Sequence, residues 1–284
     1  MASSFASRAI ASNENSVERI QSIHPNRSKG AALVLHGLNL NPDKMRLMIT
    51  LLTHSGIDVV KVSLSGHGKN YCQKWHIDEI KARMETFKTV SYKLWINETY
   101  QAYDIAEKIS REKHLPLFLV GYSLGGLLGV DLFATNSNVY FNRMVLLAPA
   151  LHVNIMYNAI KFLLPFPKLV IPSFSSPSYR ANFGTPVAAY RVLFDAIEHF
   201  HQNMTSKLNI PTLVLIDPRD ELVSYEGIKQ MIKSKGFDQW KLHLLKKTKN
   251  DAKKKPRHLI IDESTVGKDS WDRMKHLIIR HLLG

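Results

Sequence analysis

A glycine-flanked serine is the first group in this sequence with a clear capacity for chemistry. Ser123 lies at the centre of a G-x-S-x-G pattern formed by Gly121, Tyr122, Ser123, Leu124 and Gly125. An apolar run before it, residues 117–120, predicts a buried strand, and small and apolar residues over 126–133 predict a helix after it. The glycines lack the Cβ atoms that would collide in so tight a turn. We therefore predict that Ser123 is a nucleophile exposed at the end of a sheet, rather than part of a glycine-rich turn.

A serine hydroxyl becomes a good nucleophile only when a base removes its proton. In hydrolases with this elbow, the order along the chain is serine, acid, histidine. His243 lies within a predicted strand, and His276 and His281 lie on a predicted helix near the end of the chain. His258 lies in a loop beyond the last predicted strand, from which its ring can reach Ser123. We predict His258 as the base, with a surface histidine as the alternative.

The acid that orients the histidine is expected in the loop after the preceding strand. Three carboxylates occur there, on Asp217, Asp220 and Glu221. Asp217 stays close to the strand end, whereas Pro218 begins a turn that projects Asp220 from the loop. Asp220 is therefore the first candidate, and Asp217 and Glu221 remain alternatives.

Two backbone N–H groups are needed to stabilise an oxyanion. The N–H of Leu124, directly after the nucleophile, is one candidate donor. The N–H of Leu38, in the turn after the first predicted strand, is the other. His36 is expected to support this turn structurally, and we assign no chemistry to His67 in the turn Gly66-His67-Gly68.

Apolar strands that alternate with longer helical patterns predict an α/β fold, with a mostly parallel, doubly wound sheet covered on both faces. Helices are expected over residues 42–54, with Asn41 as N-cap, over residues 80–113 with an interruption near Val90, and over residues 270–283. The predicted strands are Ala31–Leu35, Val59–Leu64, Leu117–Gly121, Met144–Leu147, Thr212–Ile216 and Lys241–Leu245.

Residues 150–191 break this alternation. They are rich in proline and in large apolar residues such as Phe162, Phe166 and Phe183. An insertion of this kind between two strands of a sheet is expected to lie above the strand ends as a helical lid, and a long packed connection without a binding role is the alternative. We therefore predict a single domain over residues 1–284 with a lid or cap insertion at about 150–191.

Composition narrows the class of protein. The chain of 284 residues has 45% hydrophobic and 22% charged residues, as is typical of a soluble globular protein. No run approaches the roughly 18 uninterrupted apolar residues of a membrane-spanning helix, and residues 1–17 lack the apolar core of a signal peptide. The single cysteine, Cys72, excludes an internal disulfide framework. We expect a cytoplasmic protein, with signal-independent export as the open alternative.

The formal net charge of +14 favours contact with anionic partners such as a phospholipid surface. The densest basic stretch, residues 246–257, is expected to be a solvated surface loop. We find no interleaved aromatic residues, nucleic-acid-binding module or zinc-ligand spacing, so nucleic-acid binding is disfavoured.

These motifs, in this order, resemble the α/β-hydrolase family from about residue 30 onward, and most of all its carboxylesterase and monoacylglycerol-lipase branch, which shares patterns with serine aminopeptidases of the S33 type. The resemblance implies an eight-stranded sheet, a lid after the sixth family strand, a Ser123–His258–Asp220 triad, and no metal or organic cofactor. Two departures stand out: Asp217 replaces a frequent glycine, and the basic stretch before His258 is longer than usual. The matching segments are His36-Gly37, Gly66-His67-Gly68, Gly121–Gly126, Asp220–Val223 and His258.

The leading hypothesis is a serine hydrolase that cleaves carboxylic esters with a hydrophobic acyl chain, of the carboxylesterase, monoacylglycerol lipase or lysophospholipase type. Its substrate would be a small-molecule or lipid ester, and peripheral contact with an anionic membrane is a further expectation. The alternatives are a thioesterase or peptidase with the same triad, a catalytically silent scaffold that binds a ligand or partner, and a basic adaptor at a membrane surface. The sequence does not determine the oligomeric state.

Overall fold

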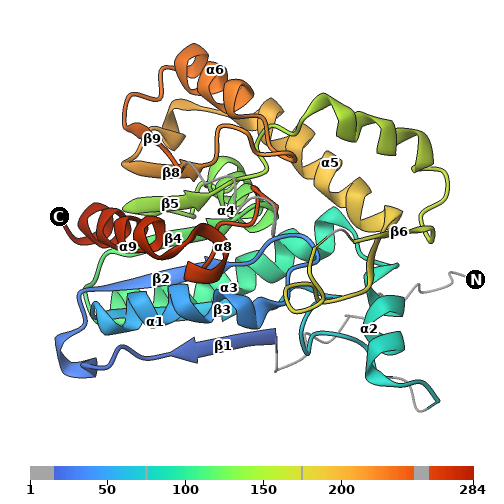
Figure 1. Ribbon diagram of the computed structural model, residues 1–284. Coiled ribbons are helices and arrows are strands. Elements are labelled where there is room, and N and C mark those ends of the chain that lie inside the picture. The colour runs from blue at the N-terminus through green and yellow to red at the C-terminus, as the bar shows by residue number, and fades with distance from the viewer. Residues whose placement is uncertain (1–15, 74–75, 174, 246–255) are drawn as a thin grey trace, which may run out of the picture.

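A seven-stranded sheet forms the centre of the computed structural model, which describes residues 16–73, 76–173, 175–245 and 256–284 (Figure 1). The strands are ordered β1-β3-β2-β4-β5-β8-β9. β1 pairs antiparallel with β3, and every other pair is parallel. All parallel strands therefore end at the same edge of the sheet. The strand bounds are β1 Val17–Ile20, β2 Gly30–Leu35, β3 Ile57–Val62, β4 Leu117–Tyr122, β5 Arg143–Leu147, β8 Thr212–Ile216 and β9 Trp240–Leu244.

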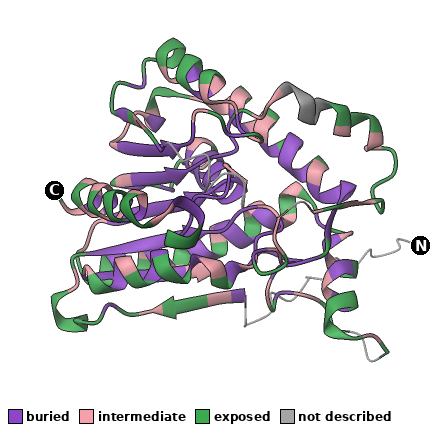
Figure 2. Cartoon of the chain, viewed as in Figure 1, coloured by how far each residue is buried: buried purple, intermediate pink, exposed green. Residues whose placement is uncertain are grey.

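Helices cover both faces of the sheet. α3 and α4 pack on one face, and α1 and α9 pack on the other. The two faces bury separate hydrophobic clusters, and the central strands between them are almost wholly buried (Figure 2). The α-helices are α1 Arg46–His54, α2 Glu79–Phe87, α3 Tyr92–Glu112, α4 Leu124–Thr135, α5 Val187–Asn203, α6 Tyr225–Lys235, α8 Glu263–Val266 and α9 Lys268–Leu283; the 3-10 helices are η2 Pro25–Arg27, η3 Pro42–Met45, η4 Ile155–Leu163 and η5 Ser206–Leu208.

Polar caps start several of these helices where the sequence indicates them. The Asn41 side chain accepts a hydrogen bond from the N–H of Asp43, which confirms its predicted capping role. Ser91 caps α3 in the same way, immediately after the predicted interruption near Val90. Within the part of the chain that the structure describes, no helix has both the length and the apolar character needed to cross a membrane.

The six predicted strands are all present, with bounds that differ from the prediction by at most two residues. The observed sheet differs from the prediction in two ways. β1 was not predicted, because its sequence Val-Glu-Arg-Ile carries only two apolar residues on a partly buried edge strand. Among the described residues the main sheet has seven strands, one fewer than the resemblance implies.

Residues 150–191, called the cap segment below, leave the sheet after β5 and return to it through α5. The segment is less helical than expected, because it combines η4 with a small antiparallel pair, β6 Val170–Pro172 and β7 Gly184–Pro186, before α5 begins. In Figure 1 it extends from the carboxyl edge of the sheet. Most of the predicted basic loop, residues 246–255, lies outside the described residues.

Candidate active site

The turn between β4 and α4 holds Ser123 in a strained conformation. Its φ of 52° and ψ of −117° are uncommon for a residue with a side chain. Neighbouring glycines make the turn possible, since a Cβ on Gly121 would lie 2.5 Å from the Cα of Gly126, and one on Gly125 would lie 2.5 Å from the carbonyl oxygen of Leu35. The N–H of Ser123 donates to the carbonyl of Leu147 on β5, which fixes the turn to the neighbouring strand.

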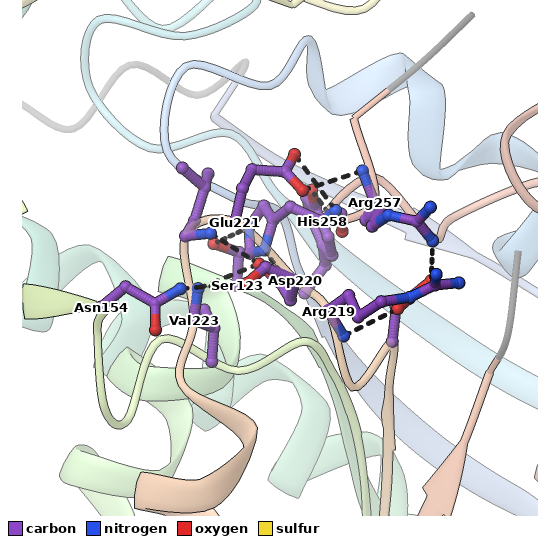
Figure 3. Close-up of polar contacts among 11 residues, drawn as sticks. Ser123, Asn154, Arg219, Asp220, Glu221, Val223, Arg257 and His258 are labelled. Carbon is purple, nitrogen blue, oxygen red and sulfur yellow. Dashed lines mark hydrogen bonds and ion pairs between the residues drawn. The ribbon is translucent and has the colours of Figure 1, made fainter. Parts of the chain in front are cut away.

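His258 lies between Ser123 and Asp220 (Figure 3). Its Nδ1 is 2.8 Å from Oδ2 of Asp220, and its Nε2 is 2.8 Å from Oγ of Ser123. A carboxylate only accepts hydrogen bonds, so Nδ1 carries the proton and Nε2 is free to accept the serine hydroxyl proton. The three side chains are all buried, and this geometry is the one required for proton transfer from serine to histidine.

The loop that carries Asp220 also orients its carboxylate. Its Oδ1 accepts hydrogen bonds from the N–H groups of Leu222 and Val223, at 2.8 and 2.9 Å. These bonds leave Oδ2 directed at His258. The turn that places Asp220 is closed by a hydrogen bond from its own N–H to the carbonyl of Asp217.

The two alternative carboxylates contact other groups. Asp217 pairs with the guanidinium of Arg257 at 3.2 Å, and no hydrogen bond between it and His258 occurs among the described residues. Glu221 accepts hydrogen bonds from the backbone N–H of Arg257 at 3.0 Å and, more weakly, from that of His258 at 3.4 Å. The structure thus brings Asp220, and neither alternative, to the imidazole.

Tyr122 also contacts His258. Its ring centroid is 5.3 Å from that of the imidazole, and its hydroxyl donates to the carbonyl of His258 at 3.3 Å. Burial raises the pKa of the Tyr122 phenol well above its ordinary value, so the group stays neutral. Tyr122 therefore contributes packing and one hydrogen bond to the histidine.

Leu38 lies in the turn after β2, and Leu124 lies at the start of α4, directly after Ser123. Among the hydrogen bonds between described residues, neither backbone N–H has an acceptor. Leu38 and Ser123 both line the same cavity. Two N–H groups thus remain available beside the serine, as an oxyanion site requires.

Two buried histidines hold the loop that carries Leu38. His36 Nε2 accepts a hydrogen bond from the N–H of Leu64 and its Nδ1 donates to the carbonyl of Gly37, which confirms the structural role predicted for it. His67 Nε2 accepts from the N–H of Asn39 at 2.9 Å. Burial lowers the pKa of His36 to about 4 and that of His67 well below its ordinary value, so both rings are neutral at pH 7.

The cap segment is attached to the loops on both sides of the site. Near its start, the N–H of Asn154 donates to the carbonyl of Leu222, and its side-chain amide donates to the carbonyl of Asp220 (Figure 3). Near its end, Asn182 and Asn39 exchange hydrogen bonds: Asn39 Oδ1 accepts from the N–H of Asn182, and Asn39 Nδ2 donates to its carbonyl.

A cavity of about 260 Å³ opens beside Ser123 and His258. Apolar and aromatic groups dominate its walls, and many of them belong to the cap segment or its continuation into α5. Its lining residues are Leu38, Asn39, Leu40, Tyr122, Ser123, Ala150, Val153, Pro172, Ser173, Ser175, Tyr179, Thr185, Tyr190, Leu193, Glu221, Leu222, Val223, Pro256, His258 and Leu259. Such a cavity suits a hydrophobic group attached to a polar reacting centre.

The other histidines considered in the sequence lie on β9 and α9, as predicted: His243 on the former, His276 and His281 on the latter. No contact between any of them and Ser123 occurs among the described residues. Over the same residues, no group of three or more His, Cys, Asp or Glu side chains is arranged to hold a metal ion.

Sequence reasoning missed four residues of this site: Asn39, Asn154, Asn182 and Arg257. Each acts by bridging segments that are far apart in the chain, and Asn39 and Asn182 are separated by 143 positions. The one local signal is Asn39, because asparagine is enriched among residues that adopt a positive φ, and its φ is 53°.

Residues 26–249 match the model of a family described as serine aminopeptidase, S33. No curated protein sequence matches the chain.

Several solved structures are similar over nearly the whole chain. A soluble variant of monoglyceride lipase from Saccharomyces cerevisiae, solved with a substrate analogue, has a TM-score of 0.70 at 14% identity, with 93% of this chain and 91% of that chain covered. A monoacylglycerol lipase from Paleococcus ferrophilus has a TM-score of 0.64 at 18% identity, with 93% and 98% covered. A structure of the metagenome-derived lipolytic enzymes LipS and LipT has a TM-score of 0.68 at 19% identity, with 94% and 95% covered. At these identities the likeness shows a shared fold.

Proposed function

The chain belongs to the serine aminopeptidase S33 family of α/β-hydrolases, and from this premise we propose that it cleaves carboxylic esters through Ser123, His258 and Asp220. The observation that carries the proposal is the continuous hydrogen-bonded series from Ser123 through His258 to Asp220, with both contacts at 2.8 Å, beside an apolar cavity. The same groups on other folds perform acyl transfer, because the chemistry depends on geometry and not on chain order.

In this mechanism, Nε2 of His258 removes the hydroxyl proton of Ser123 as its Oγ attacks the ester carbonyl carbon. The N–H groups of Leu38 and Leu124 stabilise the negative charge that develops on the carbonyl oxygen. Collapse of the tetrahedral intermediate breaks the bond to the alcohol oxygen, which takes the proton from His258. A water molecule, deprotonated by His258, then attacks the acyl-enzyme and releases the carboxylic acid and free Ser123.

We propose a single domain in which the cap segment forms a lid over an acyl-binding cavity. The apolar walls contributed by Val153, Tyr190 and Leu193 support a substrate with a hydrophobic acyl chain. A lipid ester such as a monoacylglycerol or a lysophospholipid has this chemistry, with a polar head group that is left at the cavity mouth.

The outer surface of the cap segment supports peripheral contact with an anionic membrane. Phe162, Phe166 and Phe183 are exposed by 84%, 63% and 54%. Exposed aromatic side chains on a chain with a net charge of +14 suit insertion into an anionic membrane interface. Co-sedimentation with vesicles tests this contact. We expect stronger binding to anionic than to neutral vesicles, weakening with salt, and equal binding to both would contradict it.

Hydrolysis of p-nitrophenyl esters, from acetate to palmitate, tests the proposed activity. We expect turnover by the wild-type protein that is lost in Ser123→Ala and His258→Ala. His276→Ala is the matched control, because it removes an exposed histidine of α9, and it should retain turnover. Retained activity in Ser123→Ala would contradict the proposal. The preferred chain length would report how long an acyl group the cavity accepts.

A peptidase is the second candidate, because the matching family is described as an aminopeptidase. An aminopeptidase needs an acidic group to receive the substrate's ammonium, and Glu221 lines the cavity. Both carboxylate oxygens of Glu221 already accept backbone N–H groups, which favours the ester. Turnover of aminoacyl p-nitroanilides without turnover of esters would favour the peptidase over the esterase.

A further inference from the structure

The loop that carries Asp220 contacts the loop that carries His258 through three different carboxylates. We call residues 217–223 the acid loop and residues 256–259 the histidine loop. Asp217 binds the Arg257 guanidinium. Asp220 binds the imidazole, and Glu221 binds the backbone N–H groups of Arg257 and His258 (Figure 3). The acid loop therefore contacts both side chains and backbone groups of the histidine loop.

The pair between Asp217 and Arg257 is strongly constrained by burial. The Asp217 side chain has no exposed area and that of Arg257 is 19% exposed. A buried carboxylate without a cationic partner is costly, so the pair resists separation. Asp217 is itself held in place, since its Oδ1 accepts the N–H of Arg219 at 2.8 Å. Arg257, directly before the histidine, is thus fixed to a rigid point at the end of β8.

The histidine loop is not part of a helix or a strand, so contacts from other elements must set its position. Glu221 holds the N–H side of the His258 backbone, and Tyr122 holds its carbonyl. The imidazole must reach two atoms, Oγ of Ser123 and Oδ2 of Asp220, at 2.8 Å each. A shift of the backbone would lengthen at least one of these contacts.

We infer that Asp217, Glu221 and Arg257 are positioning residues, which lock the histidine loop to the acid loop so that His258 reaches Ser123 and Asp220 together. The inference rests on the proposed role of His258 as the base. The two carboxylates that the sequence offered as alternative catalytic acids have a separate task, which is to hold the base in register with the nucleophile.

Arg257→Met and Asp217→Asn, singly and combined, test the inference with a soluble short-chain ester. We expect Arg257→Met to lower kcat by about 10- to 100-fold with little change in KM, because misplacement of a catalytic group affects the chemical step. Arg257→Lys should recover part of the loss. The double variant, which removes the buried negative charge together with the cation and so protects against misfolding, should lose no more than Arg257→Met, because Asp217 and Arg257 act through one contact.

A matched control is available at the opposite edge of the sheet. Lys113 pairs with Asp58 at 2.7 Å, and the Asp58 side chain is 3% exposed. The Lys113 side chain is 37% exposed, and neither residue lines the cavity. Lys113→Met therefore breaks an ion pair with a buried carboxylate outside the site, and it should leave kcat unchanged. Glu221→Gln, which weakens the acceptance of backbone N–H groups, should lower kcat by a smaller factor than Arg257→Met.

A spectroscopic measurement separates this inference from the proposed function. The Nδ1–H of His258, bonded to Asp220, should give a downfield proton resonance that His258→Ala lacks, and detecting it needs no substrate. We expect the resonance to be broadened or lost in Arg257→Met and kept in Lys113→Met. A resonance that is unchanged in Arg257→Met, or a kcat within about twofold of wild type, would overturn the positioning role. Turnover that survives in Ser123→Ala would instead overturn the proposed function.

Discussion

The two halves of the candidate active site are held by different forces. The nucleophile half, Ser123 and the turn after β2, is fixed by backbone hydrogen bonds, a strained elbow and neutral buried rings such as His36. The histidine half is fixed by charged contacts between two loops, with Asp220 and His258 separated by 38 positions. Close packing and neutral hydrogen bonds therefore fix the first half, and contacts of charged side chains fix the second.

This difference determines what damages each half. The nucleophile half should be sensitive to added volume and to protonation of its neutral histidines, and insensitive to the loss of a surface charge. The histidine half should tolerate changes of volume near its exposed edge and respond to the removal of single carboxylates.

The largest effect is expected for Asp220→Asn, which should lower kcat by about 1,000-fold or more by favouring the wrong histidine tautomer. Asp217→Asn and Glu221→Gln are the matched controls, because they alter carboxylates of the same loop that do not contact the imidazole. Steady-state kinetics with one short-chain ester compares all three. A greater loss in either control would show that the acid is assigned to the wrong residue.

Gly125→Ala should break the nucleophile half through volume alone. The added Cβ would lie 2.5 Å from a backbone oxygen of Leu35, which no side-chain movement can relieve. We expect a loss of about 3 kcal/mol in the free energy of unfolding, at the upper end of overpacking effects. Gly236→Ala is the control, since φ there is +64° and nothing lies within 4 Å of an added Cβ.

Urea denaturation should show a cost of only about 1 kcal/mol for Gly236→Ala, which comes from the left-handed backbone. An equal loss of unfolding free energy in Gly125→Ala and Gly236→Ala would contradict the view that close packing at the elbow fixes Ser123.

The same comparison explains how much of the site the sequence could predict. Ser123 and the N–H of Leu124 beside it follow from a local pattern, a strand and a helix joined by a glycine-flanked turn. β2, β4, β5 and β8 were predictable because burial on both faces leaves a nearly continuous apolar run. The weakly apolar edge strand β1 gives no such signal, and it was missed.

For the histidine half, the sequence limits the candidate acids to three residues but does not establish which of them contacts His258. Three carboxylates lie within five positions, and their tasks depend on how one turn is closed, by the N–H of Asp220 on the carbonyl of Asp217. Arg257 carried no separate signal because it ends a long basic stretch. Long-range contacts of this kind require the positions of both loops, which no local pattern contains.

Acidification should destabilise the nucleophile half. The folded-state pKa of His36 is lowered by burial to about 4, below the ordinary value of 6.5. As the pH falls below 6.5, His36 therefore becomes protonated in the unfolded chain while it stays neutral in the folded one. The free energy of unfolding decreases over this range, down to about pH 4. We expect His36 to contribute about 3 kcal/mol of this loss.

His67, with a pKa also lowered by burial, acts in the same direction, whereas burial raises the pKa of Glu98, whose protonation opposes the loss. Urea denaturation at several pH values between 7 and 4 measures the sum. His36→Gln should flatten the curve, and an identical pH dependence in this variant would show that His36 does not carry the effect.

The smallest effect is expected for Asn39→Gly, which should lower kcat by about 10-fold with little loss of stability. Glycine keeps the positive φ of 53° but removes both side-chain hydrogen bonds to Asn182, so the turn that carries Leu38 keeps only backbone bonds to the cap segment, such as that from the N–H of Ala181 to the carbonyl of Asn39. His114→Gly is the control, because it relaxes a φ of 52° at an exposed position and should leave kcat unchanged. Affinity for a transition-state analogue should fall with kcat in Asn39→Gly. If kcat and this affinity both stay at wild-type values, backbone contacts are enough to hold the proposed oxyanion donor, and the Asn39 side chain has no part in placing it.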